Sequence, residues 1–320
     1  MSWGGRAVLV TGATGLVGSW LTHRLLADGA DVVALVPELD SRSEFARARL
    51  ADRVRVVYGA LEPAAIDRAV LDTEVDTVFH LGAQTIVGPA RVDPLGTFEA
   101  NIRGSYLLLD ACRRSERVQR VVVASSDKAY GTTDELPYTE SVPLRGRQPY
   151  EVSKSCTDLL AQSYATTYGL PVAVARCGNI YGGGDLNWSR IVPGTIRSLL
   201  RGETPVIRSD GTLIRDYLHV DDVVEAYLAL ADWVDRAAPS GDDIAFNFSD
   251  ESPLTVLEIY SAVTAAMGAA DPIILGQASD EIPAQHLDAS RARTELGWKA
   301  QVSLEAGIDR TVEWYRSLLS

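Results

Sequence analysis

The chain has 320 residues, 46% of them hydrophobic and 23% charged, with a formal net charge of −13. This length suffices for one large α/β domain and a smaller lobe, and the acidic balance argues against non-specific binding of nucleic acid, whose phosphates would be repelled. Three scattered cysteines and four histidines show no metal-ligand spacing, and no apolar stretch reaches the roughly 20 residues of a membrane span.

Short apolar runs in the first half of the chain are typical of buried parallel strands. They cover residues 7–10, 31–36, 54–57, 77–81, 118–124 and 172–176, with helical segments at about 16–28, 64–71, 95–114 and 150–168. Alternating strands and helices predict βαβ units and a parallel sheet covered on both faces. The expected fold class is therefore α/β, with a Rossmann-type doubly wound parallel sheet.

This rhythm breaks at about residue 178. A loop follows at 182–185, then a helix at 191–201 and a turn at 210–211, and the stretch from 249 onward is mixed, ending in an amphipathic helix near 304–318. We predict a dinucleotide-binding domain over 1–177, to which 215–248 returns, with 217–233 rejoining the main sheet. Residues 178–214 and 249–320 would form a smaller mixed lobe that binds the substrate.

Three glycines follow the first strand and open the first helix, in the spacing Gly12-x-x-Gly15-x-x-Gly18. Glycines there permit a tight turn and close approach of the backbone to a pyrophosphate, and the helix N-terminus offers free N–H groups to the phosphates. A turn that binds nothing could have the same composition, but its place between strand and helix favours a dinucleotide. The predicted cofactor contacts are Gly12, Thr14, Gly15, Leu16, Val17 and Gly18.

The end of the second strand leaves the choice of nicotinamide cofactor open. An acidic residue there would bind the ribose 2′-hydroxyl of NAD, and an arginine would favour the 2′-phosphate of NADP. Glu38 or Asp40 could serve NAD, whereas Arg42 could serve NADP or lie in solvent. We predict NAD, with NADP not excluded.

A tyrosine and a lysine, Tyr150 and Lys154, stand four residues apart in a helical segment and so project from one face. A nearby ammonium favours the phenolate, which lets a tyrosine act as a base near neutral pH, although such pairs also arise by chance. Ser126, Asp127 and Lys128 follow a buried strand at its carboxyl end, where open α/β sheets bind ligands. The last two could instead form a surface ion pair of little energetic value.

Further motifs follow the glycine turn in order: His-Leu-Gly-Ala-Gln at 80–84, Ser-Ser at 125–126, the Tyr150/Lys154 pair, Asn-Ile-Tyr-Gly at 179–182 and Arg-Asp-Tyr-Leu-His-Val-Asp-Asp at 215–222. Together, over nearly the whole chain, they resemble the extended short-chain dehydrogenase/reductase family of nucleotide-sugar epimerases and dehydratases. The resemblance implies an NAD(P)-dependent enzyme, a homodimer paired through the helices at 95–114 and 150–168, and three groups of site residues. These are catalytic Ser126, Tyr150 and Lys154; cofactor contacts Leu81, Ala83, Tyr150 and Lys154; and substrate contacts Gln84, Ser126, Asn179 and Arg215.

The resemblance also implies a common first step, in which Tyr150 removes the proton of the sugar C4 hydroxyl while hydride leaves C4 for the nicotinamide. A 4-epimerase returns the hydride to the other face of C4. A 4,6-dehydratase also removes the C5 proton, protonates the leaving O6 and returns the hydride to C6. It therefore needs two more proton-transfer groups, and Asp127 as acid and a desolvated Lys128 as base would supply them.

The Asp-Lys pair, Gln84 and the Gly-Gly-Gly-Asp at 182–185 resemble the CDP-glucose 4,6-dehydratases, whereas Arg-Asp-Tyr-Leu-His at 215–219 is the family's general form. Gly59-Ala60 also departs from the family, where a Gly-Asp pair often contacts adenine. We predict a nucleotide-sugar 4,6-dehydratase. The alternatives are a 4-epimerase with the same serine, tyrosine and lysine, and a non-catalytic dinucleotide-binding sensor; the base and sugar stay open.

Three arginines, Arg190, Arg208 and Arg215, lie in or near the predicted substrate lobe. One or two of them could clamp a diphosphate, for which we name Arg190 and Arg215, and at least one is expected to be surface charge. His80, at a strand end, is expected to support cofactor packing rather than catalysis, and His286 to be structural. The expected partner is a nucleotide-diphosphate sugar, with no nucleic acid and no membrane. The scattered thiols, and the absence of a signal peptide in residues 1–6, predict a cytoplasmic protein.

Overall fold

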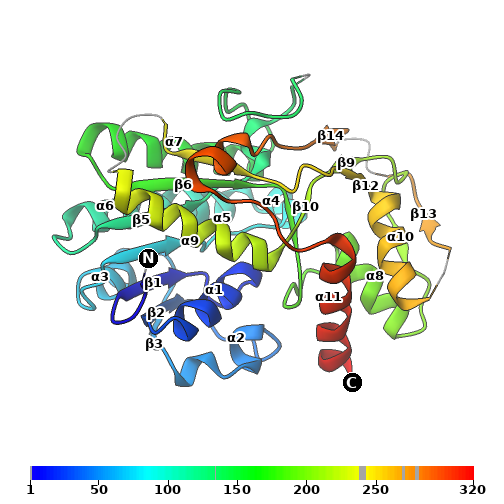
Figure 1. Cartoon of the computed structure of the whole chain (residues 1–320), viewed down its shortest axis with the longest axis horizontal. Coiled ribbons are helices and arrows are strands. Elements are labelled where there is room, and N and C mark those ends of the chain that lie inside the picture. Colours follow the sequence, from blue (N-terminus) through cyan, green and yellow to red (C-terminus); the bar gives the residue numbers. More distant parts are fainter. Residues whose placement is uncertain (1, 134, 238–242, 269–270, 278–280) are drawn as a thin grey trace.

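Seven parallel strands form the central sheet of the computed structural model, which describes residues 2–133, 135–237, 243–268, 271–277 and 281–320 (Figure 1). Their order is β11-β6-β5-β4-β1-β2-β3. The strands are β1 (Ala7–Thr11), β2 (Asp31–Val36), β3 (Arg55–Tyr58), β4 (Thr77–His80), β5 (Arg120–Ala124), β6 (Val172–Cys177) and β11 (Ala245–Phe248). Read across the sheet from the β3 edge, the order β3-β2-β1-β4-β5-β6 is that of a Rossmann sheet, which confirms the predicted fold class.

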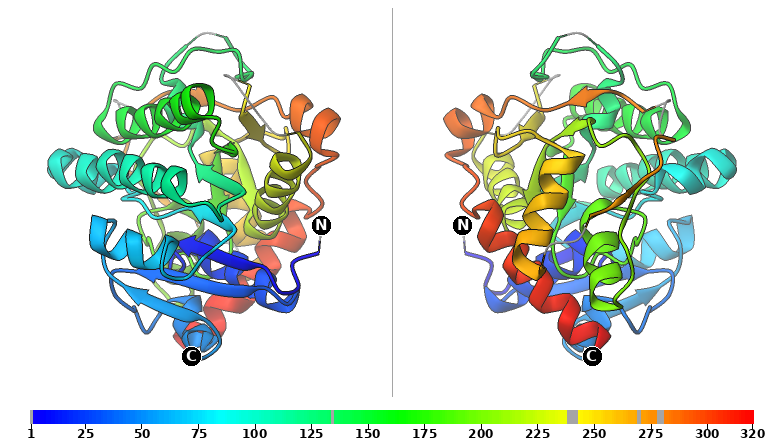
Figure 2. Two further views of the ribbon diagram at one scale, coloured as in Figure 1. Left: turned by 90° about the vertical axis from the view of Figure 1, so that its left-hand side faces the viewer. Right: turned by 90° about the vertical axis from the view of Figure 1, so that its right-hand side faces the viewer.

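Helices cover both faces of this sheet (Figures 1 and 2). One face carries α1 (Leu16–Ala27) and α9 (Val220–Ala237); the other carries α3 (Pro63–Val70), α6 (Gly104–Arg114) and α7 (Pro149–Tyr168). None of the helices in the described ranges is long and apolar enough to cross a membrane.

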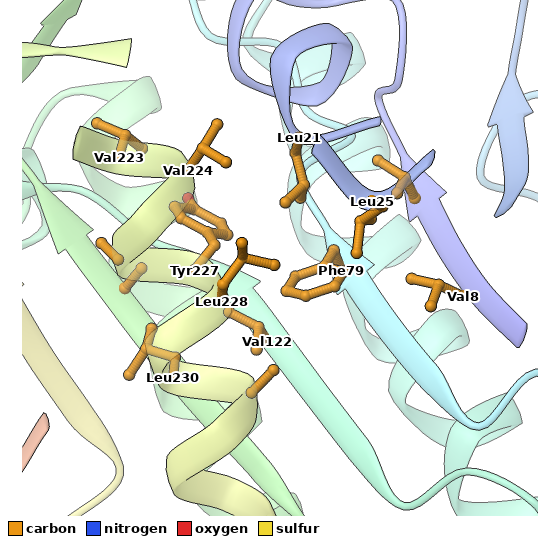
Figure 3. Close-up of a cluster of buried hydrophobic side chains, with 14 of the residues drawn as sticks. Val8, Leu21, Leu25, Phe79, Val122, Val223, Val224, Tyr227, Leu228 and Leu230 are labelled. Atoms are coloured by element: carbon orange, nitrogen blue, oxygen red, sulfur yellow. The ribbon is translucent and has the colours of Figure 1, made fainter. Parts of the chain in front are cut away.

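The hydrophobic core has two layers, one on each face of the sheet, because successive side chains along a strand point to opposite faces. Val8 of β1 packs with α1 and α9, whereas its neighbour Leu9 packs with α3, α6 and α7. Figure 3 shows Leu21 of α1 and Leu228 of α9 meeting Phe79 of β4. Apolar residues that follow one another in these strands therefore serve two different helix layers, which explains the continuous apolar runs in the sequence.

The predicted helix over 95–114 is divided into three parts. They are α5 (Pro94–Phe98), the π-helical turn η2 (Glu99–Arg103) and α6. Asp93 caps α5 by accepting a hydrogen bond from the Gly96 N–H at 2.9 Å. Asn101 lies in the wide turn, where its amide is used for tertiary hydrogen bonds, and π turns of this kind often mark functional sites.

The segment 217–233 meets the main sheet differently from the prediction. β10 (Tyr217–His219) pairs with β7 (Asn179–Tyr181) in a separate two-stranded sheet, α9 then lies on the main sheet, and β11 adds the strand beside β6. The assignment of these segments to domains stays a prediction.

The C-terminal region packs on its own apolar core, which includes Tyr181, Ile196, Ile259, Val312 and Tyr315. Its helices are α8 (Ile191–Leu200), α10 (Val256–Met267) and α11 (Leu304–Leu319). Short strands bind it together: β8 (Val206–Ile207) with β13 (Ile273–Ile274), and β9 (Ile214–Arg215) with β12 (Leu254–Thr255) and β14 (Ala284–Gln285). Shorter helical pieces elsewhere are α2 (Glu44–Arg47), η1 (Leu50–Asp52), α4 (Val87–Val92), η3 (Asp127–Tyr130) and η4 (Ala292–Leu296).

Candidate active site

One cavity of about 1380 Å³ runs along the carboxyl ends of the central strands. This is the edge of an open α/β sheet where ligands bind. Apart from the residues considered for the cofactor ribose, the candidate site residues line it: Gly12, Thr14, Gly15, Leu16, Val17, Gly18, Leu81, Ala83, Gln84, Ser126, Asp127, Lys128, Tyr150, Lys154, Asn179, Arg190 and Arg215. The fold therefore brings the candidates together, and their individual roles stay predictions.

The glycine turn joins β1 to α1 where the strand order reverses, between β1 and β4. Gly12 has a φ of +69°, and its carbonyl accepts a hydrogen bond from the Gly15 N–H at 3.0 Å. A Cβ on Gly18 would lie 2.1 Å from the Gly12 carbonyl oxygen, and a Cβ on Gly12 would lie 2.8 Å from the Gly82 nitrogen. This backbone therefore requires glycine at both positions, as a turn that receives a pyrophosphate does.

A buried hydrogen-bond chain ties the end of β4 to the end of β1. The Thr11 hydroxyl accepts the N–H groups of Leu81 and Gly82 at 3.1 and 2.9 Å and lies 2.9 Å from Nδ1 of His80. Nε2 of His80 lies 2.9 Å from the Ser105 hydroxyl. Burial, and to a lesser extent the charge of Lys154, lowers the pKa of His80 to about 3, so the ring is neutral. This geometry agrees with the packing role expected for His80.

Helix α7 places Tyr150 and Lys154 on its buried side. Pro149 occupies its first turn, and Gln148 and Glu151 form a capping box that fixes where the helix begins. Burial raises the pKa of Tyr150 to about 12; among the charged groups, Arg190 does most to lower it. The Lys154 ammonium donates to the Ala124 carbonyl at 2.7 Å, and burial lowers its pKa to about 8. Arg190, which the sequence named only as a substrate contact, therefore acts on the tyrosine as well.

The three residues after β5 form a connected polar group. Ser126 caps the short helix η3: its hydroxyl accepts the Lys128 N–H at 3.2 Å and donates to Asp127 Oδ1 at 2.9 Å. Lys128 Nζ lies 3.0 Å from Asp127 Oδ2, with the two side chains 18% and 3% exposed. The pair therefore lies mostly buried at the cavity wall, and the alternative of a surface ion pair is wrong.

Three arginines meet where the main cavity joins a side pocket of about 330 Å³ in the C-terminal region. Arg215 donates to the carbonyls of Ile214 and Pro283 at 2.7 and 3.3 Å and is held almost wholly inside. Arg190 forms an ion pair with Asp185 at 3.0 Å. Arg208 lines both cavities but is exposed, and it donates to the Ser189 carbonyl at 2.9 Å. Arg215 also lies 3.4 Å from Glu281, so Arg190 and Arg215 each have a carboxylate partner while their guanidinium groups line the cavity.

The structure shows the surroundings of Gln84 and of the residues after β2, whose contacts with ligands stay predictions. The amide of Gln84 is folded back onto the backbone N–H and carbonyl of Ile86, so its side chain is already engaged. Glu38, Asp40 and Arg42, considered for the cofactor ribose, are not among the described residues that line the cavity. Asp40 and Arg42 instead pair with each other at 2.8 Å. Glu62, from the end of β3, lines the cavity and was not considered.

Residues 8–246 match the model of the NAD dependent epimerase/dehydratase family. The chain belongs to this family. A UDP-glucose 4-epimerase of Mycolicibacterium smegmatis is 32% identical over 97% of this chain and 98% of its own. A CDP-glucose 4,6-dehydratase of Salmonella typhimurium is 28% identical over 98% of this chain and 92% of its own. The crystal structure of DesIV, a dTDP-glucose 4,6-dehydratase of Streptomyces venezuelae with NAD and TYD bound, superposes with a TM-score of 0.86 at 29% identity, covering 97% of each chain.

Family membership makes the chain an NAD-dependent enzyme of the nucleotide-sugar epimerase/dehydratase class, and the sensor alternative is discarded. The glycine turn fits NAD. Side chains at Gly12 and Gly18 would collide with neighbouring backbone and would prevent the tight turn that receives a pyrophosphate. Both chemistries occur among relatives of similar identity, so the comparisons support the class and leave the reaction open. The described residues hold no cluster of three or more histidine, cysteine, aspartate or glutamate side chains that could bind a metal ion.

Two buried polar residues beside the cavity lining were not predicted from the sequence. Asn101 accepts the Gln84 N–H at 2.7 Å and donates to the Gln84 carbonyl and the Ser153 hydroxyl, both at 2.9 Å. Asp216, next to Arg215, accepts the Leu287 N–H at 2.8 Å, and burial raises its pKa to about 7. Only slight signals for these residues are present in the sequence. Asn101 lies between Gly96 and Gly104 in a helical segment, and Asp216 lies inside the motif at 215–222.

Proposed function

We propose that this enzyme is a nucleotide-sugar 4,6-dehydratase. The observation that supports this reaction is the contact between Asp127 and Lys128 beside Ser126, in the cavity that also holds Tyr150. Elimination of water needs an acid and a base beyond the group that acts at C4. A carboxylate and an amine that lie 3.0 Å apart at this wall meet that need.

The remaining lining residues would hold the reactants. The glycine turn and Lys154 would hold NAD, which supplies a hydride acceptor and later a hydride donor. Arg190 and Arg215 would bind the diphosphate, and Asn179, which also lines the cavity, would contact the sugar nucleotide.

Tyr150 would act first, as the base that takes the proton of the C4 hydroxyl while Ser126 hydrogen-bonds O4. Because burial keeps the pKa of Tyr150 near 12, the phenolate requires positive charge in the cavity. Arg190 supplies part of that charge, and Lys154 stands on the same helix. The resulting carbonyl at C4 makes the C5–H bond acidic.

Asp127 and Lys128 would then remove water from C5 and C6. One proton transferred along their contact leaves a carboxylic acid and a neutral amine. Lys128 takes the C5 proton while Asp127 protonates O6, which departs as water; hydride then adds to C6, and Lys128 returns a proton to C5. Two protons leave the sugar, from O4 and C5, and two return, to O6 and C5; exchange with water passes the proton held by Tyr150 back to Lys128.

A 4-epimerase is the second candidate, because the epimerase relative is at least as similar to this chain as the CDP-glucose dehydratase. That reaction would use Ser126, Tyr150 and Lys154 and would give the Asp127–Lys128 pair no chemical step. The two candidates therefore differ in what Lys128 must do.

The test is to incubate the enzyme and NAD with CDP-, UDP-, dTDP- and GDP-hexoses and to follow product mass. Loss of one water supports the dehydratase; a changed sugar of unchanged mass establishes the epimerase. Lys128→Met should abolish water loss. Lys299→Met, at an exposed lysine outside the cavity, is the matched control and should not. Water loss at the wild-type rate in Lys128→Met would refute the assigned base.

We also propose that the enzyme is a cytoplasmic homodimer. The outer faces of α6 and α7 expose large apolar side chains: Tyr106 is 38%, Leu159 52% and Tyr168 58% exposed. Exposed apolar surface on two adjacent helices suits a second copy of the same face. The three free cysteines support a reducing compartment. Sedimentation of Leu159→Glu as a monomer would support this interface, and an unchanged dimer would refute it.

A further inference from the structure

The two ends of the cofactor cavity can be told apart from the residues that line them. Tyr150 and Lys154 lie beyond β5, so the nicotinamide belongs at that end. In a Rossmann sheet the adenosine lies across the other half, over the carboxyl ends of β2 and β3. There the cavity is lined by Leu35 and Pro37 from β2 and by residues 59–62 from the end of β3.

The end of β2 offers no acidic group to the adenosine ribose. Pro37, which follows the strand and lines the cavity, has no polar side chain and no N–H. Glu38 points into solvent. Asp40 is engaged by Arg42, whose Nε and Nη2 donate to its two oxygens at 3.0 and 2.8 Å. The usual recognition of the ribose 2′-hydroxyl by a β2 carboxylate is therefore not available from the described residues of this loop.

Glu62 brings a carboxylate to the same end of the cavity from the next strand. It stands at the start of α3, followed by Pro63, and its carboxylate does not cap the helix. Among the described residues no hydrogen bond or ion pair engages that carboxylate, and the side chain is exposed at the cavity wall. A free carboxylate at a ligand cavity is available to accept hydrogen bonds from hydroxyl groups.

Charged side chains of both signs lie around Glu62. Arg68 of α3 does not line the cavity; it lies beside Gly59 and donates to the Tyr58 carbonyl at 3.1 Å. Arg103 and Glu99 of η2 line the cavity nearby, and Gly104, which follows them, packs against Leu61. Arg103 lies 3.6 Å from Glu99, so its charge is compensated. A 2′-phosphate placed here would face the negative charge of Glu62 without a free cation from these lining residues to balance it.

We propose that Glu62 selects NAD over NADP in this enzyme: its carboxylate accepts hydrogen bonds from the hydroxyls of the adenosine ribose and repels a 2′-phosphate. The acid that commonly follows β2 is thus replaced by one that follows β3. The proposal concerns cofactor binding and does not depend on whether the enzyme is a dehydratase or an epimerase.

The experiment measures binding of NADH and NADPH to the purified protein by nucleotide fluorescence, after removal of any bound nucleotide and without sugar substrate. Glu62→Gln keeps the shape and removes the charge. It should weaken NADH binding about tenfold and leave NADPH unchanged or tighter, because a charged hydrogen bond is lost in one case and a repulsion in the other. Glu62→Arg should turn the preference toward NADPH. Glu38→Gln, the matched loss of one charge outside the cavity, should change neither affinity by more than about twofold.

The ratio of the two affinities separates selectivity from damage to the fold. A misfolded variant loses both cofactors in proportion, so the preference for NADH stays the same. An unchanged ratio in Glu62→Gln and Glu62→Arg overturns the proposal. So does a shift of equal size in Glu38→Gln, which would place the discriminating acid after β2. A wild-type protein that prefers NADPH also overturns it.

Discussion

Substitution of Gly18 by alanine tests the cofactor turn with a single methyl group. The added Cβ would lie 2.1 Å from the Gly12 carbonyl oxygen, 2.8 Å from its carbon and 2.9 Å from the Ala13 Cα. All three are backbone atoms, so relief requires α1 and the turn to separate by about 1 Å, since non-bonded carbon and oxygen atoms need more than 3 Å. Overpacking of this kind costs about 1–3 kcal/mol of folding stability.

The same displacement should weaken NAD binding more than it weakens the fold. The phosphates depend on N–H groups at the start of α1, and loss of one charge-assisted hydrogen bond of about 1.5–3 kcal/mol weakens binding roughly tenfold to a hundredfold. The assay is a fluorescence titration with NADH, with thermal unfolding measured on the same samples. Gly4→Ala, where the nearest atom lies 3.8 Å away, is the control. Wild-type affinity and unfolding temperature in Gly18→Ala would refute the assigned role of this turn.

Three further changes probe the proposed catalytic base, a buried carboxyl and the support of α7. Tyr150→Phe should abolish turnover and leave NADH binding within about twofold, because only the hydroxyl is lost; residual turnover above a few per cent would contradict the mechanism. Burial raises the pKa of Asp216 from 3.8 to about 7, so between these values the folded protein holds a proton that the unfolded chain has released, and stability falls as pH rises. In wild type this group should lower the free energy of unfolding by up to about 4 kcal/mol between pH 4 and 7, and Asp216→Asn should abolish that fall in denaturant unfolding. An equal pH dependence in the two proteins would contradict the assignment. Asp158→Ala should cost about 3–5 kcal/mol in the same assay, because it leaves Arg176 buried without the carboxylate 2.8 Å away; a cost below about 1 kcal/mol would show that other groups carry that charge.

The sheet, and the meeting of the proposed catalytic residues at one edge of it, could be predicted because local patterns specify them. Apolar runs of β-branched residues that alternate with glycine turns and helical segments indicate the buried strands of a parallel sheet. The carboxyl ends of parallel strands lie at one edge of that sheet. Ser126 and Tyr150 therefore met as expected, although 24 residues separate them in the sequence.

What escaped prediction depends on tertiary contacts. Nothing local shows that Asn101 would lie in a π turn and bond Gln84, or that the charge of Arg190 would lower the pKa of Tyr150. Glu62 was not predicted because the acid of a dinucleotide site is expected after β2, whereas Glu62 stands at the start of α3. The reaction itself also stayed open, because both chemistries use the same first step.

The fate of the hydrogen at C5 tests the proposed reaction most directly. When the enzyme turns over a nucleotide-hexose substrate in heavy water, the dehydratase mechanism predicts a product that has lost one water and carries one deuterium at C5, delivered by Lys128. A product of unchanged mass, epimerised at C4 and without deuterium at C5, would contradict it.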